Sequence, residues 1–243
     1  GAILGTDEID ISKKAVIIMC ADNGVVEEGI SQSDQCVTEA VARQMGRGTS
    51  SVGKMAAIIS AKTIPVDIGM NQNQQIAGVL NKKIRCGTRN FRKEPAMTKE
   101  EAIAAILTGV DLVKDCKKNG YQILATGEMG IGNTTTSSAV VTALLKCDAA
   151  VVTGRGAGLC DEKLLHKKQI ITEAIEKYHL YEADPLTVLA TVGGLDIAGL
   201  VGVCIGGGVF HIPVVLDGVI SMTAALLAHR IIPGTADYLL PSH

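Results

Sequence analysis

The chain has 243 residues, of which 47% are hydrophobic, and a formal net charge of −2, which suits one large domain with an ample aliphatic core. Aromatic residues make up only 2%, and Lys and Arg are scattered, so the basic stripe and the stacking platform of a nucleic-acid-binding protein are both missing. The 7 cysteines include no C-x-x-C pair, which favours free thiols in the cytoplasm and excludes a disulfide framework or a cysteine zinc site.

Strand-like runs alternate with loops and helical patterns in chain order. The pattern predicts strands over residues 15–21, 63–69, 121–126, 149–153 and 213–216. It predicts helices over residues 38–45, 50–61, 98–118, 161–179, 195–206 and 219–229, with two more after Thr136 and Asp184. Thr98 and Glu101 form a capping box at the start of the third helix. This alternation favours an α/β fold with a mostly parallel sheet and helices on both faces.

The apolar stretch at residues 197–209 is the longest in the chain. It is rich in glycine and too short to cross a bilayer, so we interpret it as a buried element and expect no membrane partner.

Ligands of open parallel sheets bind beyond the carboxyl ends of the strands. Four predicted strand ends carry polar or glycine-rich loops: Asp22-Asn23-Gly24, Gly127–Thr136, Gly154–Gly158 and Asp217-Gly218. We therefore expect a ligand site where these loops converge.

The loop Gly127–Thr136 has the features of an anion site. Its glycines allow close approach to a ligand, and the free N–H groups at the start of the next helix favour negative charge. Asn133 and Thr134 add donors, whereas Glu128 would repel a phosphate and should face a hydroxyl, an N–H group or a cation. The alternative is an ordinary strand-to-helix turn capped by Asn133.

The loop Gly154–Gly158 begins like G-x-G-x-x-G but lacks the third glycine, so it is weak as a dinucleotide fingerprint. It suits a phosphate better, since Arg155 can form a fork to an oxyanion. Lys167 either belongs to a solvated helix face or reaches back to the same phosphate.

Two carboxylates, Asp22 and Asp217, each end an apolar strand. Each could hold ribose hydroxyls or a ring N–H, or could instead cap the following helix. No G-x-S-x-G, H-E-x-x-H or P-loop motif is present, so hydrolase, metalloprotease and kinase functions lack support.

Taken in order, these segments resemble the nicotinate-nucleotide–dimethylbenzimidazole phosphoribosyltransferase family. Met19–Ser31 is similar to its early signature A-D-H-G-V-x-x-x-G-V-S. Later blocks that match in the same order are Gly87–Asn90, Pro95–Thr98, Gly127–Thr135, Gly154–Leu159, Val214–Gly218 and Tyr238–His243. The match covers essentially the whole chain, and the ordered set is highly specific.

The resemblance implies a Rossmann-like three-layer fold in one phosphoribosyltransferase-type domain over residues 1–243, a homodimer, and neither metal nor cofactor. It implies that a benzimidazole nitrogen attacks C1′ of nicotinate mononucleotide, releasing nicotinate and forming α-ribazole 5′-phosphate for cobalamin assembly. The cationic pyridinium leaves without acid help, so the site must supply orientation and a base for the benzimidazole N–H.

Carried over to this sequence, the resemblance implies that Gly154–Gly158 and Lys167 hold the phosphate and that Glu128 lies near the reacting bases. Met129 and Ile131 would line an apolar slot, and Ser31 would edge the benzimidazole pocket. The full set of expected substrate-binding residues is Asp22, Ser31, Glu128, Met129, Gly130, Ile131, Gly132, Asn133, Gly154, Arg155, Gly156, Gly158, Lys167 and Asp217.

The sequence departs from the family pattern at three places. Asn23 replaces the usual His and cannot titrate near neutral pH. The family's proposed base is a Glu in a block beyond His243, so we expect no established catalytic base within this chain and take Glu128 as the candidate. We also expect the family's helical segment before Gly1 to be missing or short. The expectation is therefore a domain truncated at both ends, with little turnover but persistent binding.

Two other functions stay open at this point. One is a nucleotide-binding module without chemistry, and the other is a nicotinamide-dependent oxidoreductase, which rests on Gly154–Gly158. The accepted base is also open, because benzimidazoles, purines and phenols all fit a flat apolar slot.

Overall fold

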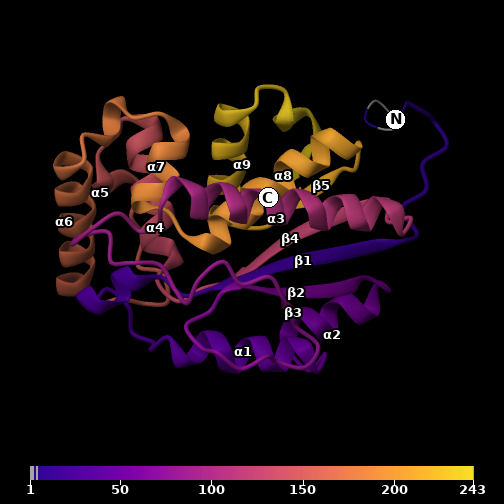
Figure 1. The fold of residues 1–243 in the computed structure, drawn as a ribbon, viewed down its shortest axis with the longest axis horizontal. Helices are drawn as coiled ribbons and strands as arrows, with labels where there is room; N and C mark the ends of the chain where they lie inside the picture. The colour runs from indigo at the N-terminus through magenta and orange to yellow at the C-terminus, as the bar shows by residue number, and fades with distance from the viewer. Residues whose placement is uncertain (1–2, 4, 243) are drawn as a thin grey trace.

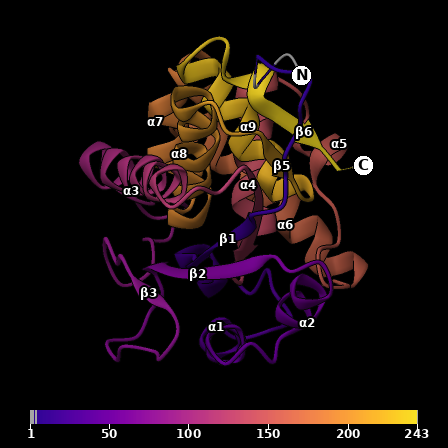
Figure 2. The same cartoon turned by 90° about the vertical axis from the view of Figure 1, so that its right-hand side faces the viewer.

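The structure is a computed structural model that describes residues 3 and 5–242. Its centre is a six-stranded parallel sheet in the order β3-β2-β1-β4-β5-β6 (Figures 1 and 2). The strands are β1 Lys14–Ala21, β2 Lys62–Gly69, β3 Leu80–Asn81, β4 Ile123–Met129, β5 Val214–Leu216 and β6 Leu239–Pro241. The predicted parallel sheet is confirmed.

Helices cover both faces of this sheet. They are α1 Cys36–Gly46, α2 Ser51–Ile58, α3 Lys99–Lys118, α4 Asn133–Leu145, α5 Ala149–Val152, α6 Asp161–Lys177, α7 Pro185–Val192, α8 Leu195–Phe210 and α9 Val219–Ile231. Short 3₁₀ turns occupy Gly24–Glu28, Leu180–Glu182 and Thr235–Tyr238. Figures 1 and 2 show α1 and α2 on one side of the sheet and α3, α8 and α9 on the other, which is the predicted three-layer arrangement.

Strand β1 shows why the sheet is buried on both faces. Ile17 and Met19 belong to the large core beneath α3 and α8, while Ile18 and Cys20 belong to a smaller core beneath α1. Successive side chains of a strand point to opposite faces, so a strand covered on both sides is a continuous apolar run. This explains why the run is unbroken in the sequence.

The glycine-rich stretch at residues 197–209 lies in α8, which packs against α3. A Cβ at Gly109 of α3 would lie 2.8 Å from the Cα of Gly202 of α8, so the two backbones approach closely only because both residues are glycine. The prediction of a buried element is confirmed. Within the described residues, no helix is both long enough and apolar enough to cross a membrane.

The strand predicted over residues 149–153 is wrong, because α5 occupies Ala149–Val152. The Asp148 side chain accepts a hydrogen bond from the Ala150 N–H and starts this helical turn. Short apolar runs do not separate strand from helix by periodicity, and local capping decides here. The loop Gly154–Gly158 therefore follows a helix and not a strand.

Other boundaries differ by smaller amounts. β4 runs to Met129, so Glu128 lies in the strand and not in the loop. The helix predicted over residues 161–179 begins at Asp161 as expected, with Cys160 as its N-cap, but ends earlier, at Lys177. Strand β6 was not predicted, and it pairs with β5. His243, the last residue of the final matched block, lies outside the described residues.

Two predicted helix starts are confirmed. The Thr98 hydroxyl accepts from the Glu101 N–H at 3.1 Å while the Glu101 carboxylate accepts from the Thr98 N–H at 2.7 Å. Asp184 caps α7, with Pro185 at its first position. These local devices need no tertiary contact, which is why the sequence predicts them.

Candidate active site

The loops after β1 and β4 meet at one edge of the sheet. Gly132 has φ of 94°, and a Cβ there would lie 2.7 Å from Val26 Cγ2 and 3.3 Å from Asn23 Cβ. Only glycine suits both the left-handed backbone and this close approach. The turn leading into α4 therefore lies directly against the segment that follows β1.

A cavity of about 120 Å³ lies beside this contact. Its lining includes eight of the expected binding residues: Ser31, Gly130, Ile131, Gly132, Asn133, Arg155, Gly156 and Lys167. The structure thus brings together three segments, around residues 31, 131 and 156, that lie far apart in the sequence.

Lys167 reaches back from α6 into this cavity. Its side chain is buried, with 1% of the residue exposed, and Nζ donates to Thr134 Oγ1 at 2.9 Å and to the Gly154 carbonyl oxygen at 3.4 Å. None of the ion pairs found in the described part of the chain involves this ammonium. Burial lowers the pKa of Lys167 to about 8. A buried ammonium with only neutral oxygen partners favours an anion beside it.

Gly156 brings the backbone of its loop up to this lysine. Its φ is +54°, and a Cβ there would lie 3.1 Å from Thr134 Oγ1 and 3.9 Å from Lys167 Nζ. Arg155 behaves differently, because Nη1 donates to the Leu159 carbonyl oxygen at 2.9 Å and Nη2 pairs with Asp161. The guanidinium therefore stabilises its own loop, and the fork to an oxyanion is not preformed.

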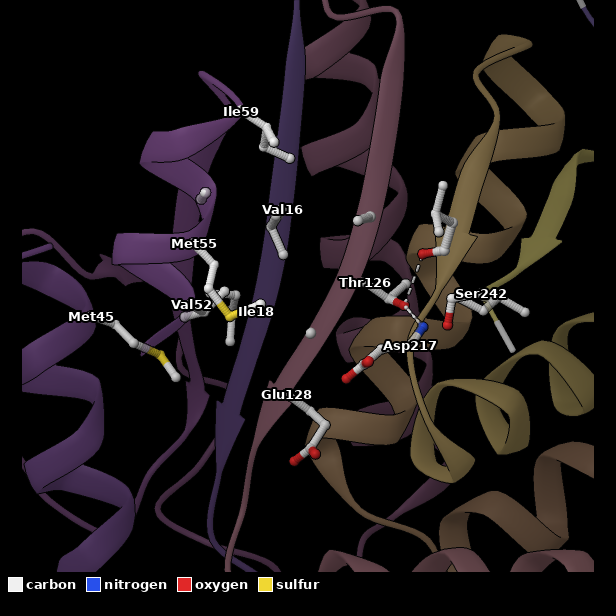
Figure 3. A pocket seen from close by; sticks show the side chains of 15 residues that line it. Val16, Ile18, Met45, Val52, Met55, Ile59, Thr126, Glu128, Asp217 and Ser242 are labelled. Carbon is white, nitrogen blue, oxygen red and sulfur yellow. Dashed lines mark hydrogen bonds between the residues drawn. The ribbon is translucent and has the colours of Figure 1, made fainter. Parts of the chain in front are cut away.

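A larger cavity of about 520 Å³ lies between α2 and the sheet face formed by β1, β4 and β5 (Figure 3). Its walls are mostly apolar and include Val16, Ile18, Met45, Val52, Met55 and Ile59. Glu128 and Asp217 are the only two carboxylates among the described residues that line it. The Asp217 N–H donates to Thr126 Oγ1 at 3.2 Å, which fixes the end of β5 against β4.

Glu128 and Asn133 connect the two cavities. Asn133 Nδ2 donates to Glu128 Oε2, and the same nitrogen donates to Asp196 Oδ2 at 3.0 Å. Burial raises the pKa of Glu128, the Asn133 amide opposes that rise, and the charge of Asp217 adds to it. The glutamate thus faces an N–H group, and its carboxylate is a stronger base than an exposed one.

Some expected residues lie elsewhere. Asp22, Met129 and Gly158 line neither cavity. Asp22 is buried and accepts from the Asn71 N–H at 2.7 Å, so it orders the loop after β2. Gly154 lines a third cavity of about 310 Å³, next to Gly156.

Sequence reasoning missed two residues of this site. Thr134, noted only as a donor, is the partner of Lys167, and Asp196 is the fully buried partner of Asn133. Asp196 could have been found from its position at the start of the longest apolar stretch. A carboxylate there is expected to be buried, and a buried carboxylate needs a specific partner.

Known proteins match this chain over all or nearly all of its length. A family model described as "Phosphoribosyltransferase" matches residues 1–243. Among the relatives, the nicotinate-nucleotide–dimethylbenzimidazole phosphoribosyltransferase of Clostridium perfringens is 44% identical over 96% of this chain and 65% of its own length. That of Acetivibrio thermocellus is 47% identical, over 96% of this chain and 66% of its own length. The chain therefore spans about two thirds of these relatives.

The fold agrees with a solved structure. The crystal structure of CobT from Thermus thermophilus matches with a TM-score of 0.94 and 35% identity, over 100% of this chain and 73% of that one.

Proposed function

Because the chain belongs to the nicotinate-nucleotide–dimethylbenzimidazole phosphoribosyltransferase family, we propose that it binds nicotinate mononucleotide and serves transfer of the phosphoribosyl group to 5,6-dimethylbenzimidazole or a related base. The products are nicotinate and α-ribazole 5′-phosphate, a part of the cobalamin nucleotide loop. One observation carries the proposal: the buried Lys167 ammonium lies on the cavity that Asn133 connects to Glu128.

The phosphate would bind beside Lys167. Its ammonium supplies the positive charge, Thr134 Oγ1 orients it, and Gly156 lets backbone approach the anion. The first turn of α4 adds the positive end of its dipole. A monoester dianion would also raise the pKa of Lys167 and keep the ammonium charged.

The reacting centre would lie between this phosphate and Glu128. The benzimidazole lone pair forms the new bond to C1′, the bond to the pyridinium breaks, and its electron pair neutralises the departing nicotinate ring. The remaining N–H proton of the benzimidazole must be removed, and we assign Glu128 as the candidate acceptor. Ile131 and Ser31 would border the base from the smaller cavity.

The relatives are longer than this chain, and the resemblance places the family's base beyond a Pro-Ser-His block. Nicotinate release by this chain should therefore be compared with release by a version extended at its C-terminus. Equal and substantial rates would show that no later segment is needed and that the chain carries its own base.

Binding is tested by calorimetric titration with nicotinate mononucleotide. Lys167→Met should weaken binding about 10- to 100-fold, since a hydrogen bond to a charged group contributes about 1.5–3 kcal/mol. Lys163→Met is the matched control, because Lys163 lies exposed on the same helix. If both variants bind like the unaltered protein, the phosphate site is not at Lys167.

We also propose that the protein is a homodimer and that it is cytoplasmic. The homodimer and the cytoplasmic location come from the resemblance and from the free cysteines, three of which are buried. Sedimentation at several protein concentrations tests the dimer, and a monomer at all of them would contradict it.

A further inference from the structure

A line of polar side chains runs from the larger cavity into the interior behind it. Glu128 faces the cavity, Asn133 follows, and Asp196 and Asn23 are both 0% exposed. Asn133 Nδ2 has two hydrogens and donates one to each carboxyl group, to Glu128 Oε2 and to Asp196 Oδ2. Two acidic groups therefore share one amide.

Asn23 has an acceptor that lacks a donor. Its Oδ1 is buried and accepts no hydrogen bond within the part of the chain that the structure describes. A buried acceptor without a partner costs about 1–3 kcal/mol. Reversing the amide would leave the Ile131 carbonyl oxygen without Asn23 Nδ2, which donates to it at 3.4 Å.

The neighbour of this acceptor is the second oxygen of Asp196. A Cβ at Gly194 would collide with both Asp196 Oδ1 and Asn23 Oδ1, so the two oxygens border the same small space. Asp196 Oδ1 already accepts from the Ile197 N–H at 3.0 Å. A proton on one of the two oxygens would replace their mutual repulsion by attraction, and only the carboxyl group can carry it.

The charges around Asp196 favour its neutral form. The charged group that faces Asp196 is Glu128, whose pKa is itself raised by burial and by the charge of Asp217. The Cys20 thiol is the other titratable group near both carboxyl groups. Among the ion pairs of the described residues, none involves either carboxyl group of this pair. Burial, and next the charge of Glu128, raises the pKa of Asp196 to about 7.

We propose that Asp196 is a positioning residue for Glu128: it holds a proton directed at Asn23 Oδ1 and, through Asn133, fixes the Glu128 carboxylate toward the reacting base. With Asp196 neutral, Glu128 carries the only charge of the pair and stays free to accept the benzimidazole proton. The role of Glu128 as acceptor of the benzimidazole proton rests on the proposed function, whereas the presence of a proton on Asp196 does not.

The proton is tested without substrate, by infrared spectroscopy of the 243-residue protein. We expect the infrared difference spectrum between the unaltered protein and Asp196→Asn to contain the C=O stretch of a protonated carboxyl group below the pKa of about 7. This band should fade as the pH rises through that value. Asp111→Asn, at an exposed position on α3, should show no such band. If the difference spectrum of Asp196→Asn also lacks the band, at every pH where both proteins are folded, the proposal is overturned.

The positioning role is tested by titrating dimethylbenzimidazole into protein saturated with nicotinate mononucleotide, across the same pH range. Two coupled carboxyl groups should give a two-step pH dependence of affinity, and Asp196→Asn should reduce it to one step. Asp196→Ala should bind about 10-fold more weakly, with partial rescue in Asp196→Asn. An unchanged two-step profile in Asp196→Asn means that Asp196 is merely structural. A protein that binds neither ligand sinks the proposed function and the positioning role together, while the infrared result still decides the proton.

Discussion

Replacing Lys167 should make the protein more stable and less able to bind its ligand. The pKa of this ammonium falls from the ordinary 10.5 to about 8 because burial removes its hydration. That difference corresponds to about 3 kcal/mol of cost for keeping the folded protein charged at this position. Lys167→Met removes the cost and loses the hydrogen bond to Thr134, which as a bond to a charged group contributes about 1.5–3 kcal/mol. We expect a net gain of about 1 kcal/mol at neutral pH.

The pH dependence gives a second, independent signature. Between pH 8 and 10.5 the unfolded chain holds a proton on Lys167 that the folded protein has released. The free energy of unfolding of the unaltered protein therefore rises with pH across that window. This added stability is lost again as the pH falls through about 8. Lys167→Met should lack this contribution, so its advantage over the unaltered protein should shrink toward pH 10.5.

Urea denaturation at several pH values measures both effects, with Lys163→Met as the control for loss of an exposed charge on α6. Taking the difference between proteins cancels other groups that titrate in the same range. Binding of nicotinate mononucleotide should also be accompanied by proton uptake near pH 8, seen by calorimetry in buffers of different ionisation enthalpy. If Lys167→Met is less stable at neutral pH and shows the same pH slope, the ammonium is not desolvated and the reasoning fails.

Three further substitutions, two of them paired with a control glycine, test the backbone of the site, the core and a helix cap. Gly156→Ala should lower stability by about 1 kcal/mol and weaken nucleotide binding because φ is +54°, whereas Gly154→Ala, with no atom within 4 Å of its Cβ, should have little effect on thermal unfolding. Gly109→Ala should cost about 1–3 kcal/mol by separating α3 from α8, whereas Gly208→Ala, whose Cβ would lie 3.5 Å from its nearest neighbour, should cost nothing in the same denaturation assay. Thr98→Ala should cost about 1 kcal/mol through loss of the capping box, and equal unfolding midpoints would argue that the cap adds no stability.

Local patterns were enough to predict the starts of α3 and α7 and most strands. The capping box at Thr98 and the cap at Asp184 act within four residues of chain, and the unbroken apolar run of β1 reports burial on both sides of a sheet. The same reasoning was wrong at residues 149–153, where a four-residue helix forms from β-branched and alanine residues alike. A segment this short takes its conformation from its cap and its neighbours.

Many residues of the candidate site could be predicted from the sequence, but the contacts between them could not. Glycine loops, a lysine on the helix after one of them and strand-end carboxylates are visible in the sequence because each is a residue type in a recognisable position. Which of them meet is a tertiary matter: Lys167 turns inward to Thr134, while Arg155 turns to Asp161 and Asp22 to the Asn71 backbone.

The sequence by itself determined the alternation of strands and helices and the parallel sheet, since each follows from spacing along the chain. Only the tertiary structure decided that Glu128 and Asp196 share the Asn133 amide and that Asn23 Oδ1 lies without a donor beside them. Those relations join residues up to 173 positions apart, from Asn23 to Asp196, and depend on the glycines that let the loops after β1 and β4 come into contact.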